Sequence, residues 1–433
     1  MIYQKLFSYL TKSRDSFLHK GSAQNIAILT LGTTFAQGAT IAATVLLTRL
    51  FSPADFGAFA LFLSVVAIVS TLVTLRYEVN ILIPKTYNEA ENLLFLSLTL
   101  AILVGCFIVI SALALPYELQ KFVGLGALRS WLPLACIIGI VVALTTTTCA
   151  WLNRCQRYLE IAQIKIMQSV AFAIIALIFG YYSYDSGLLV AQAISAVAVL
   201  SLAVRYLPKP SYERFRSGLT AAKPFSVSPK YMLPTAMLDV ITLQIPLVLI
   251  SLWYGASDAG QFSLAWRVLV LPASLIGLAV SQVFYQRFSV AWPDKSAARS
   301  LLTRTWKALA LFGLLPLVVM IFAGRILFIY VFGPNWADAG MMASVLAPML
   351  FVSLLHSPTS TTSIVLGLQK HVLLLSFIVL VYRPLSIYIG WVFNDIFLGL
   401  QIYCALEIIQ MLFFQYLVLN KISSHSISRE RKL

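Results

Sequence analysis

The stretch Asp55-Phe56-Gly57-Ala58-Phe59-Ala60-Leu61 returns as Asp258-Ala259-Gly260-Gln261-Phe262-Ser263-Leu264, an offset of 203 residues (258 − 55). Each copy of this D-x-G-x-F-x-L pattern lies between the first and second long apolar runs of one half of the chain. The matching position in the two halves predicts a duplicated bundle of membrane helices. Duplicated bundles are how many transporters build a central site that opens to either side of the bilayer.

The composition predicts that most of the chain lies in lipid. Hydrophobic residues make up 60% of the 433 residues and charged residues only 11%, whereas soluble domains have roughly 45–50% apolar and 25% charged residues. Stretches of about 20 apolar residues predict membrane helices. Twelve such spans are expected, at residues 24–48, 58–83, 92–115, 131–152, 161–183, 187–206, 231–254, 260–285, 304–329, 340–366, 371–393 and 397–419.

The expected fold is an all-α membrane protein whose twelve transmembrane helices form two pseudo-symmetric six-helix lobes. The lobes are related as parallel repeats, because both halves begin on the same side. The expected segments are an interfacial N-terminal segment, an N-terminal lobe, a proline-rich linker, a C-terminal lobe and a tail, at residues 1–23, 24–206, 207–230, 231–419 and 420–433. No polar segment is long enough to form a soluble enzyme domain.

The basic residues predict the orientation. The connections on the side of the N-terminus, together with both tails, hold 25 of the 31 Lys and Arg residues, and the opposite connections hold four. Cytoplasmic loops of membrane proteins carry this excess, so both termini are expected in the cytoplasm. The net charge of +15 is therefore explained by topology and by attraction to anionic lipids. It does not indicate a nucleic-acid partner.

Several classes of chemistry lack their sequence signals. The five cysteines form no C-x-x-C pair and have no histidine near them in sequence, so a zinc site is not expected. No G-x-x-x-x-G-K-[ST] phosphate loop occurs, so the chain is not expected to hydrolyse ATP. No cofactor is expected.

Prolines distinguish the halves. The C-terminal half carries seven prolines within its expected spans, whereas the N-terminal half carries only Pro133 well inside one. Each interior proline removes a backbone hydrogen bond and bends its helix. In lipid such freed carbonyls are tolerated where protein or a wet cavity satisfies them. We therefore expect the C-terminal lobe to line the cavity; better packing of kinked helices is the alternative.

Charges inside spans indicate function, because an ion in hydrocarbon is costly unless it is paired or hydrated. Arg383 and Glu407 fall near mid-membrane on the last two spans, and they are expected to pair or to take part in ion coupling. Asp239 is a further candidate for coupling to a proton or cation. Arg267 has no partner in its own span, and the planar guanidinium suits a diphosphate. Pairing between Arg267 and Asp239 is the alternative.

Other polar residues are weaker candidates for substrate contact. Arg49 ends the first span and Arg76 lies near the inner end of the second, where anchoring at the interface would explain both. Three glutamines within spans, Gln37, Gln244 and Gln282, have side chains that could hydrogen-bond sugar hydroxyls. Polar residues in spans are at least as often hydrogen-bonded between helices.

At these residues the chain resembles bacterial oligosaccharide flippases of the Wzx type, in the superfamily that also contains multidrug exporters. Residues 47–57 (LTRLFSPADFG) are similar to the L-T-R-x-[FY]-x-P-x-[DE]-[FY]-G signature, and residues 74–78 (TLRYE) followed by Pro84-Lys85 to a T-L-R-Y-E…P-K segment. Residues 267–284 resemble the family's eighth helix. Asn80 departs from the small apolar residue of the pattern.

The resemblance implies a pair of six-helix lobes in the bacterial inner membrane. They would move an undecaprenyl-diphosphate-linked oligosaccharide, of the O-antigen, capsule or exopolysaccharide type, from the cytoplasmic to the periplasmic leaflet by alternating access. Relatives that handle the lipid-linked peptidoglycan precursor place arginines in the central cavity, and Arg49 and Arg267 match them. Implied partners are the lipid-linked glycan, a proton or sodium gradient, and the polysaccharide polymerase and chain-length machinery.

Three other functions compete with this interpretation. An ion-coupled drug or cation antiporter of the same superfamily would need an acidic cavity rather than unpaired arginines. A membrane-embedded polymerase or glycosyltransferase would need a large extracytoplasmic loop, and the longest expected there is residues 116–130. A structural scaffold is disfavoured by the charges inside the spans.

Overall fold

The computed structural model describes residues 32–114, 128–209, 223–225, 227–292 and 294–430, and positions 116, 118 and 218. The side chains at 278, 282 and 424–430 are not described. The interfacial segment expected at residues 1–23 lies outside this part of the chain, as does most of the linker expected at residues 207–230.

Every regular element in the described ranges is helical. Residues 32–50 belong to the first helix. The labelled α-helices are α2 (Pro53–Val73), α3 (Tyr87–Ala114), α5 (Leu132–Arg154), α6 (Tyr158–Tyr181), α7 (Gly187–Val204), α9 (Leu233–Trp253), α10 (Ala256–Ala291), α11 (Lys295–Phe332), α12 (Ala337–Thr359), α13 (Thr362–Val365), α14 (Gln369–Val392) and α15 (Ile396–Glu430). Short turns of other helix types are η1 (Tyr77–Leu82), η3 (Lys223–Phe225), η4 (Ser228–Met232) and η5 (Pro334–Trp336).

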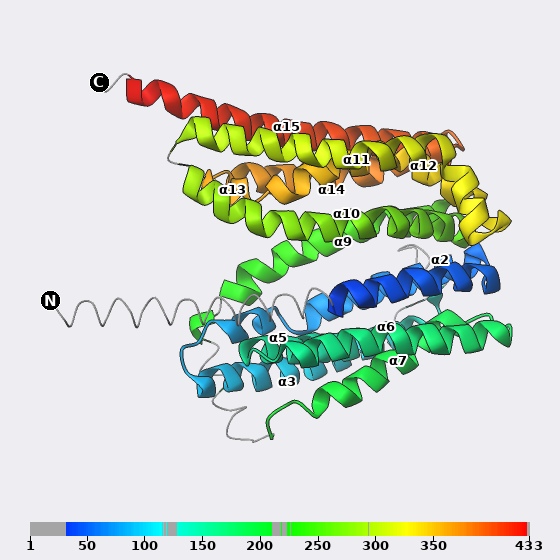
Figure 1. Ribbon diagram of the computed structural model, residues 1–433. Coiled ribbons are helices and arrows are strands. Elements are labelled where there is room, and N and C mark those ends of the chain that lie inside the picture. Colours follow the sequence, from blue (N-terminus) through cyan, green and yellow to red (C-terminus); the bar gives the residue numbers. More distant parts are fainter. Residues whose placement is uncertain are drawn as a thin grey trace. The chain divides into compact units, whose positions relative to one another are not determined.

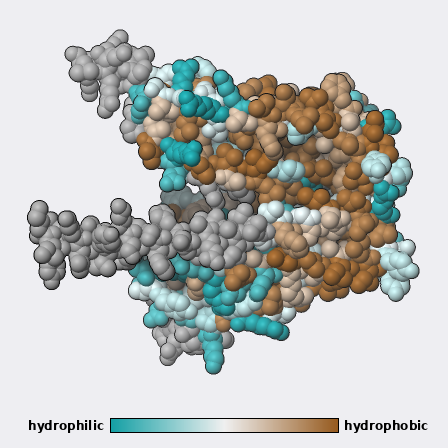
Figure 2. All heavy atoms as spheres, in the orientation of Figure 1, coloured by the Kyte–Doolittle hydropathy of each residue, from teal (hydrophilic) through white to brown (hydrophobic). Residues whose placement is uncertain are grey.

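Eleven helices of the described part are long and apolar enough to cross a membrane. Together with the helix at residues 32–50 they account for the twelve expected spans, so the predicted all-α membrane fold is confirmed. Side chains on the flanks of these helices are apolar even where they are exposed, as with Leu311 at 80% and Phe322 at 82% on α11. Figure 2 shows hydrophobic residues covering the flanks and hydrophilic residues gathered near the helix ends.

The first compact unit consists of residues 1–44, 65–114 and 131–237. Within it α5 packs against α3, α6 and α7, and α6 packs against α7 (Figure 1). The turn η1 lies against α3 and α5. There the amide of Asn80 donates to the hydroxyl of Ser228, 2.6 Å away. The polar residue that departs from the family pattern is therefore buried and partnered.

The second compact unit consists of residues 45–64, 115–130 and 238–433. In this unit α12 packs against α10, α11 and α15, and α14 packs against α15 (Figure 1). Asp294 begins α11, because its side chain accepts hydrogen bonds from the amides of Ser296 and Ala297. The hydrogen bond from the hydroxyl of Ser296 is the main cause that lowers the pKa of this exposed carboxyl below its usual value. The hydrogen bond from the amide of Ala297 lowers the pKa further.

Residues 45–64 belong to the second unit by their contacts, although they lie in the N-terminal half of the sequence. The fully buried Trp336 donates from its indole nitrogen to the carbonyl of Thr48 at 2.9 Å. Its ring meets that of Phe56 edge-on, with centroids 4.9 Å apart. The two compact units are defined by packing and not by the sequence repeat. The lobe boundaries expected at residues 24–206 and 231–419 therefore remain predictions.

The two copies of the repeated pattern touch each other in this unit. A Cβ atom at Gly57 would overlap the carbonyl oxygen of Ala256, and one at Gly260 would overlap that of Pro53. The backbones at the starts of α2 and α10 therefore cross with no room for a side chain. Close backbone approach is a main reason for glycine at a helix contact.

Candidate functional site

Arg267 lies on α10 within the second unit. Its guanidinium carbon is 5.9 Å from the centroid of the Phe59 ring, within the range of a cation–π contact. Within the described part of the chain no carboxylate lies at ion-pair distance from Arg267, and Asp239, the expected alternative partner, is not paired with it. Arg267 therefore keeps an uncompensated charge and unused hydrogen-bond donors.

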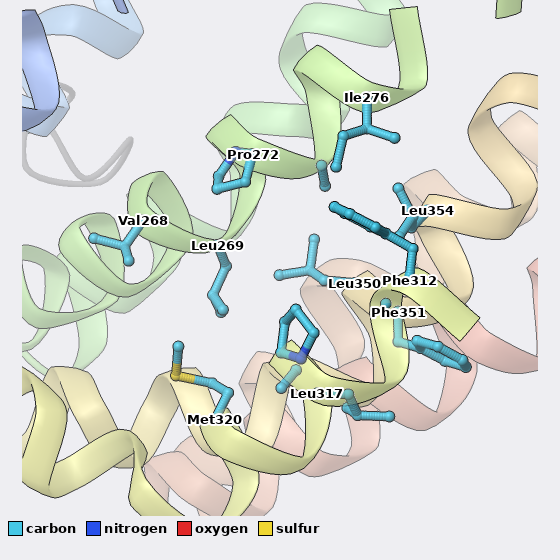
Figure 3. Close-up of a pocket in the computed structure, with 14 residues that line it drawn as sticks. Val268, Leu269, Pro272, Ile276, Phe312, Leu317, Met320, Leu350, Phe351 and Leu354 are labelled. Atoms are coloured by element: carbon cyan, nitrogen blue, oxygen red, sulfur yellow. The ribbon is translucent and has the colours of Figure 1, made fainter. Parts of the chain in front are cut away.

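An apolar cavity of about 180 Å³ begins at the residues that follow Arg267. Figure 3 shows side chains from α10, α11 and α12 pointing into it, among them Val268, Leu269 and Met320. Pro272 and Pro316 also line the cavity, and both are inside helices. Two of the prolines expected to shape a cavity in the C-terminal half therefore do line one. The lining contains no charged residue, so it suits hydrocarbon rather than sugar.

Arg383 and Glu407 form an ion pair in the same unit. The Nε of Arg383 donates to the carboxylate of Glu407 at 2.5 Å, and the two side chains are 15% and 3% exposed. The Nη1 of Arg383 donates to the carbonyl of Thr242 at 2.9 Å. This carbonyl lies four residues before Pro246, which has no amide hydrogen to bind it. The guanidinium thus replaces the helix hydrogen bond that the proline removes.

The other predicted residues of the second unit have different surroundings. Arg49 donates to the carbonyls of Tyr330 and Val331, at 3.0 and 3.3 Å, in the last turn of α11. Gln244 accepts a hydrogen bond from the hydroxyl of Ser64 at 2.9 Å. Asp239 is exposed on α9. Gln282 lies in α10, but its side chain is outside the described part of the structure.

Arg76 and Gln37 lie in the first unit. Arg76 follows α2 in a left-handed conformation, with φ +62°, and pairs with the buried Glu78 at 3.2 Å. The Oε1 atom of Gln37 is buried and has no hydrogen-bond partner. A buried polar group without a partner is costly, so the surroundings of Gln37 are of interest.

Gln37 lines a cavity of about 530 Å³ inside the first unit, between the first helix, α5, α6 and α7. Lys165 supplies its cation and is 3.3 Å from the hydroxyl of Thr33. The remaining polar lining consists of Thr40, Thr145, Thr146, Gln168, Ser169 and Gln192. A cavity of this size with amides, hydroxyls and one ammonium group is suited to a polar ligand rich in hydroxyls.

Sequence reasoning found part of this cavity and missed its cation. Gln37 was expected to contact substrate, and Thr145 and Thr146 of the threonine run at residues 145–148 line the same cavity. Both hydroxyls also donate back to carbonyls four residues earlier. Lys165 falls in the expected span 161–183 but was not a candidate site residue; α6 begins at Tyr158 and carries Lys165 and Gln168 into the bundle. The one-turn spacing of Lys165 and Gln168 in an apolar helix was the available signal.

The structure thus brings the predicted residues into two separate groups. Arg49, Gln244, Asp239, Arg267, Arg383 and Glu407 belong to the second unit, and Gln37 and Arg76 belong to the first. Within the first unit, Gln37 and Lys165 face a polar cavity. Within the second, an arginine with no carboxylate partner lies next to an apolar cavity.

Comparisons with known proteins agree with this architecture. The family model described as polysaccharide biosynthesis protein matches residues 46–341. The succinoglycan biosynthesis transport protein ExoT of Rhizobium meliloti (strain 1021) is 26% identical over 340 residues, which cover 76% of this chain and 66% of that protein. The matched region therefore spans just under two thirds of this relative's length.

Two solved structures show the same fold. The lipid II flippase MurJ, in an inward closed conformation, aligns with a TM-score of 0.69 and 15% identity, covering 93% of this chain and 91% of that one. An inward-facing multidrug resistance MATE family transporter of the MOP superfamily aligns with a TM-score of 0.65 and 17% identity, covering 92% and 99%. At these identities the likeness establishes the fold alone.

Proposed function

Because the chain belongs to the polysaccharide biosynthesis protein family, we propose that it translocates an undecaprenyl-diphosphate-linked oligosaccharide across the bacterial cytoplasmic membrane. Transport runs from the cytoplasmic to the periplasmic leaflet by alternating access, with both termini in the cytoplasm. The cargo is a repeat unit of an O-antigen, a capsule or an exopolysaccharide. The observation that carries this proposal is Arg267, a guanidinium inside a span with no carboxylate partner among the described residues.

The chemistry of the cargo fits three features of the chain. Its diphosphate needs a cation with several donors, and a guanidinium binds phosphate oxygens through paired hydrogen bonds. Its prenyl tail needs an apolar surface, which the cavity at Val268 and Leu269 offers. Its sugars need hydroxyl and amide partners, and the cavity at Gln37 and Lys165 contains them. Arg49, Arg76, Gln244 and Gln282 remain predicted contacts.

Transport in a reconstituted system tests the proposal. Vesicles containing the purified protein and undecaprenyl-diphosphate-linked oligosaccharide are assayed for movement of the glycan between leaflets with a lectin that cannot cross the membrane. We expect Arg267→Ala to abolish transport and Arg267→Lys to retain a part of it, because lysine keeps the charge and loses the planar donors. Arg157→Ala, at a half-buried pair with Glu160 in the first unit, is the matched control. Wild-type rates in Arg267→Ala would contradict the assignment.

The drug or cation antiporter is the second candidate. The fold favours it as much as the flippase, since a multidrug transporter has the same architecture. The charges do not, because a cationic substrate would meet Arg267 in one unit and Lys165 in the other. Transport of an organic cation by the wild type, with no movement of lipid-linked glycan, would replace our proposal with this one.

A further inference from the structure

The ion pair of Arg383 and Glu407 lies at a cavity that its structural role does not explain. The cavity has a volume of about 240 Å³ and lies between α10, α12, α14 and α15 of the second unit. Besides the ion pair, its polar lining consists of the hydroxyls of Ser274, Ser353 and Ser357. The other seven residues of the lining are apolar. The ion pair thus borders a space large enough for several waters.

A second cavity lies along the same helices. It has a volume of about 210 Å³, and its lining consists of His356, Ser360, Ser363, Ser376 and Gln410 beside four apolar side chains. Neighbouring residues of α12 line the two cavities, Ser357 the first and His356 the second. Glu407 and Gln410 do the same on α15, about one helical turn apart. The serines continue past the end of α12 to Ser360 and to Ser363 on α13, shortly before α14.

The side chains around His356 are suited to a hydrated path. Its Nδ1 atom is 3.2 Å from the amide nitrogen of Gln415, which also donates to the hydroxyl of Thr359 at 3.0 Å. The Oε1 atom of Gln415 is buried and has no hydrogen-bond partner. An unpartnered acceptor beside an imidazole and a cavity of this size is a position where a water molecule bonds.

We infer that these two cavities form a proton route from Ser363 on α13 to Glu407, and that Glu407 is the proton-coupling group of the transporter. This inference rests on the proposed function and names how transport is driven. In one direction a proton passes along water and hydroxyl groups and forms an O–H bond on the Glu407 carboxylate. The ion pair then loses its negative charge while Arg383 stays protonated. In the other direction the O–H bond breaks, the proton returns along the route, and the ion pair forms again.

Protonation at this position is suited to move helices. Arg383 joins α14 to the carboxylate on α15 and to the Thr242 carbonyl on α9, so one charge holds three helices together. Pro246 and Pro384 lie inside α9 and α14, close to the pair. Proline-kinked helices have fewer backbone hydrogen bonds to break on bending. A neutral Glu407 weakens the link between α14 and α15 at the position where α14 is bent.

Arg383 is the charged group that faces Glu407 among the described residues of the neighbouring helices. Arg383 and Tyr382 face it from α14, and Tyr403 and Cys404 belong to its own helix. Helix α9 contributes the Thr242 carbonyl through Arg383. In the lining of the cavity, α10 and α12 contribute Trp266 and serines but no charged residue. Arg383 is therefore the cation that a proton on Glu407 competes with.

Transport with and without a proton gradient tests the inference. In the vesicle assay described above, the wild type is expected to move lipid-linked glycan faster with the gradient than after its collapse by an ionophore. In Glu407→Gln the two rates are expected to become equal. In Ser360→Val the ion pair is intact and the route is narrowed, so the gradient is expected to accelerate transport less. Glu160→Gln, which removes the carboxylate of a half-buried ion pair in the first unit, is expected to behave as the wild type.

A second measurement does not depend on transport. Infrared difference spectra of the full-length protein between neutral and acidic pH should contain the carbonyl band of a protonated carboxyl that Glu407→Gln removes. In Ser360→Val this band should exchange with deuterium more slowly. Absence of a band that depends on Glu407, or equal gradient dependence in Glu407→Gln and the wild type, would overturn the inference. No glycan movement by the wild type would instead refute the proposed function, and the infrared result would still decide on the route.

Discussion

Two arginines of the second unit, Arg267 and Arg383, lie inside membrane helices in opposite electrostatic situations. Arg383 binds a carboxylate and a backbone carbonyl, whereas Arg267 has an aromatic ring beside it and no carboxylate partner in the described part of the chain. A charge inside a span costs several kcal/mol unless it is paired or hydrated. Protein groups compensate the charge of Arg383, whereas no described carboxylate compensates that of Arg267.

The difference arises from the neighbouring helices. At Arg383, Pro246 frees a carbonyl on α9 and Glu407 supplies a carboxylate from α15. At Arg267, the neighbouring helix is α2, which is held close by the contact of Gly57 with Gly260 and which presents Phe59. A ring face orients a guanidinium without occupying its hydrogen-bond donors. We therefore assign Arg383 to structure and coupling and Arg267 to cargo binding.

The largest expected difference concerns stability. Arg383→Met leaves a buried carboxylate unpaired, and breaking such a pair costs about 3–5 kcal/mol. Arg267→Met removes no polar partner, so we expect it to change the free energy of unfolding by less than about 1 kcal/mol. Thermal unfolding of both variants in detergent measures this contrast. In Arg383→Met/Glu407→Leu most of the lost stability should be recovered. Equal losses of stability in Arg383→Met and Arg267→Met would contradict the contrast between the two arginines.

A substitution at the contact between Gly57 and Gly260 should disturb the surroundings of Arg267 but not those of Arg383. Gly57→Ala places a Cβ atom against the carbonyl of Ala256, and overpacking of this kind costs about 1–3 kcal/mol. The shift of α2 also moves Phe59, so cargo transport is expected to fall. Gly38→Ala, with open space at the Cβ position, is the control, measured by thermal unfolding and by the vesicle assay. Wild-type stability and transport in Gly57→Ala would show that the two repeats do not depend on this close backbone contact.

The contact between Arg383 and Thr242 should depend on Pro246. Pro246→Ala restores an amide that can bind the Thr242 carbonyl, so Arg383 becomes less important for stability. We expect Arg383→Met to cost about 1 kcal/mol less in the Pro246→Ala background, the usual net value of one hydrogen bond. A double-mutant cycle of unfolding free energies measures this coupling. Strict additivity would mean that the guanidinium does not replace the missing helix bond.

The smallest expected effect concerns Phe59. Phe59→Leu removes the buried ring beside Arg267. At 5.9 Å, close to the outer limit of a cation–π contact, the ring is expected to contribute about 0.5–1 kcal/mol. We expect the affinity for undecaprenyl diphosphate to fall by roughly two- to fivefold, from RT ln of the affinity ratio. Phe107→Leu on α3, where the ring is exposed, should leave the affinity unchanged. An unaltered affinity in Phe59→Leu would show that the Phe59 ring does not contribute to the binding site.

Much of the fold was predictable from the sequence, because apolar runs of membrane length leave few alternatives to helices. The repeated pattern indicated the duplication, but not that Gly57 and Gly260 contact each other, since that depends on how helices cross. Arg383 and Glu407 were expected as a pair because they lie at similar depth on consecutive spans. Lys165 was missed, because a lysine near the start of an expected span is counted with the basic residues of the cytoplasmic side, whereas α6 begins at Tyr158 and places Lys165 inside the bundle.

The central claim is that Arg267 binds the diphosphate of the cargo. Its most direct test is calorimetric binding of undecaprenyl diphosphate and of undecaprenyl monophosphate to the wild type and to Arg267→Ala. The account predicts that the wild type binds the diphosphate more tightly than the monophosphate, and that Arg267→Ala loses this preference while unfolding at the same temperature. Equal preference in the wild type and the variant would contradict it.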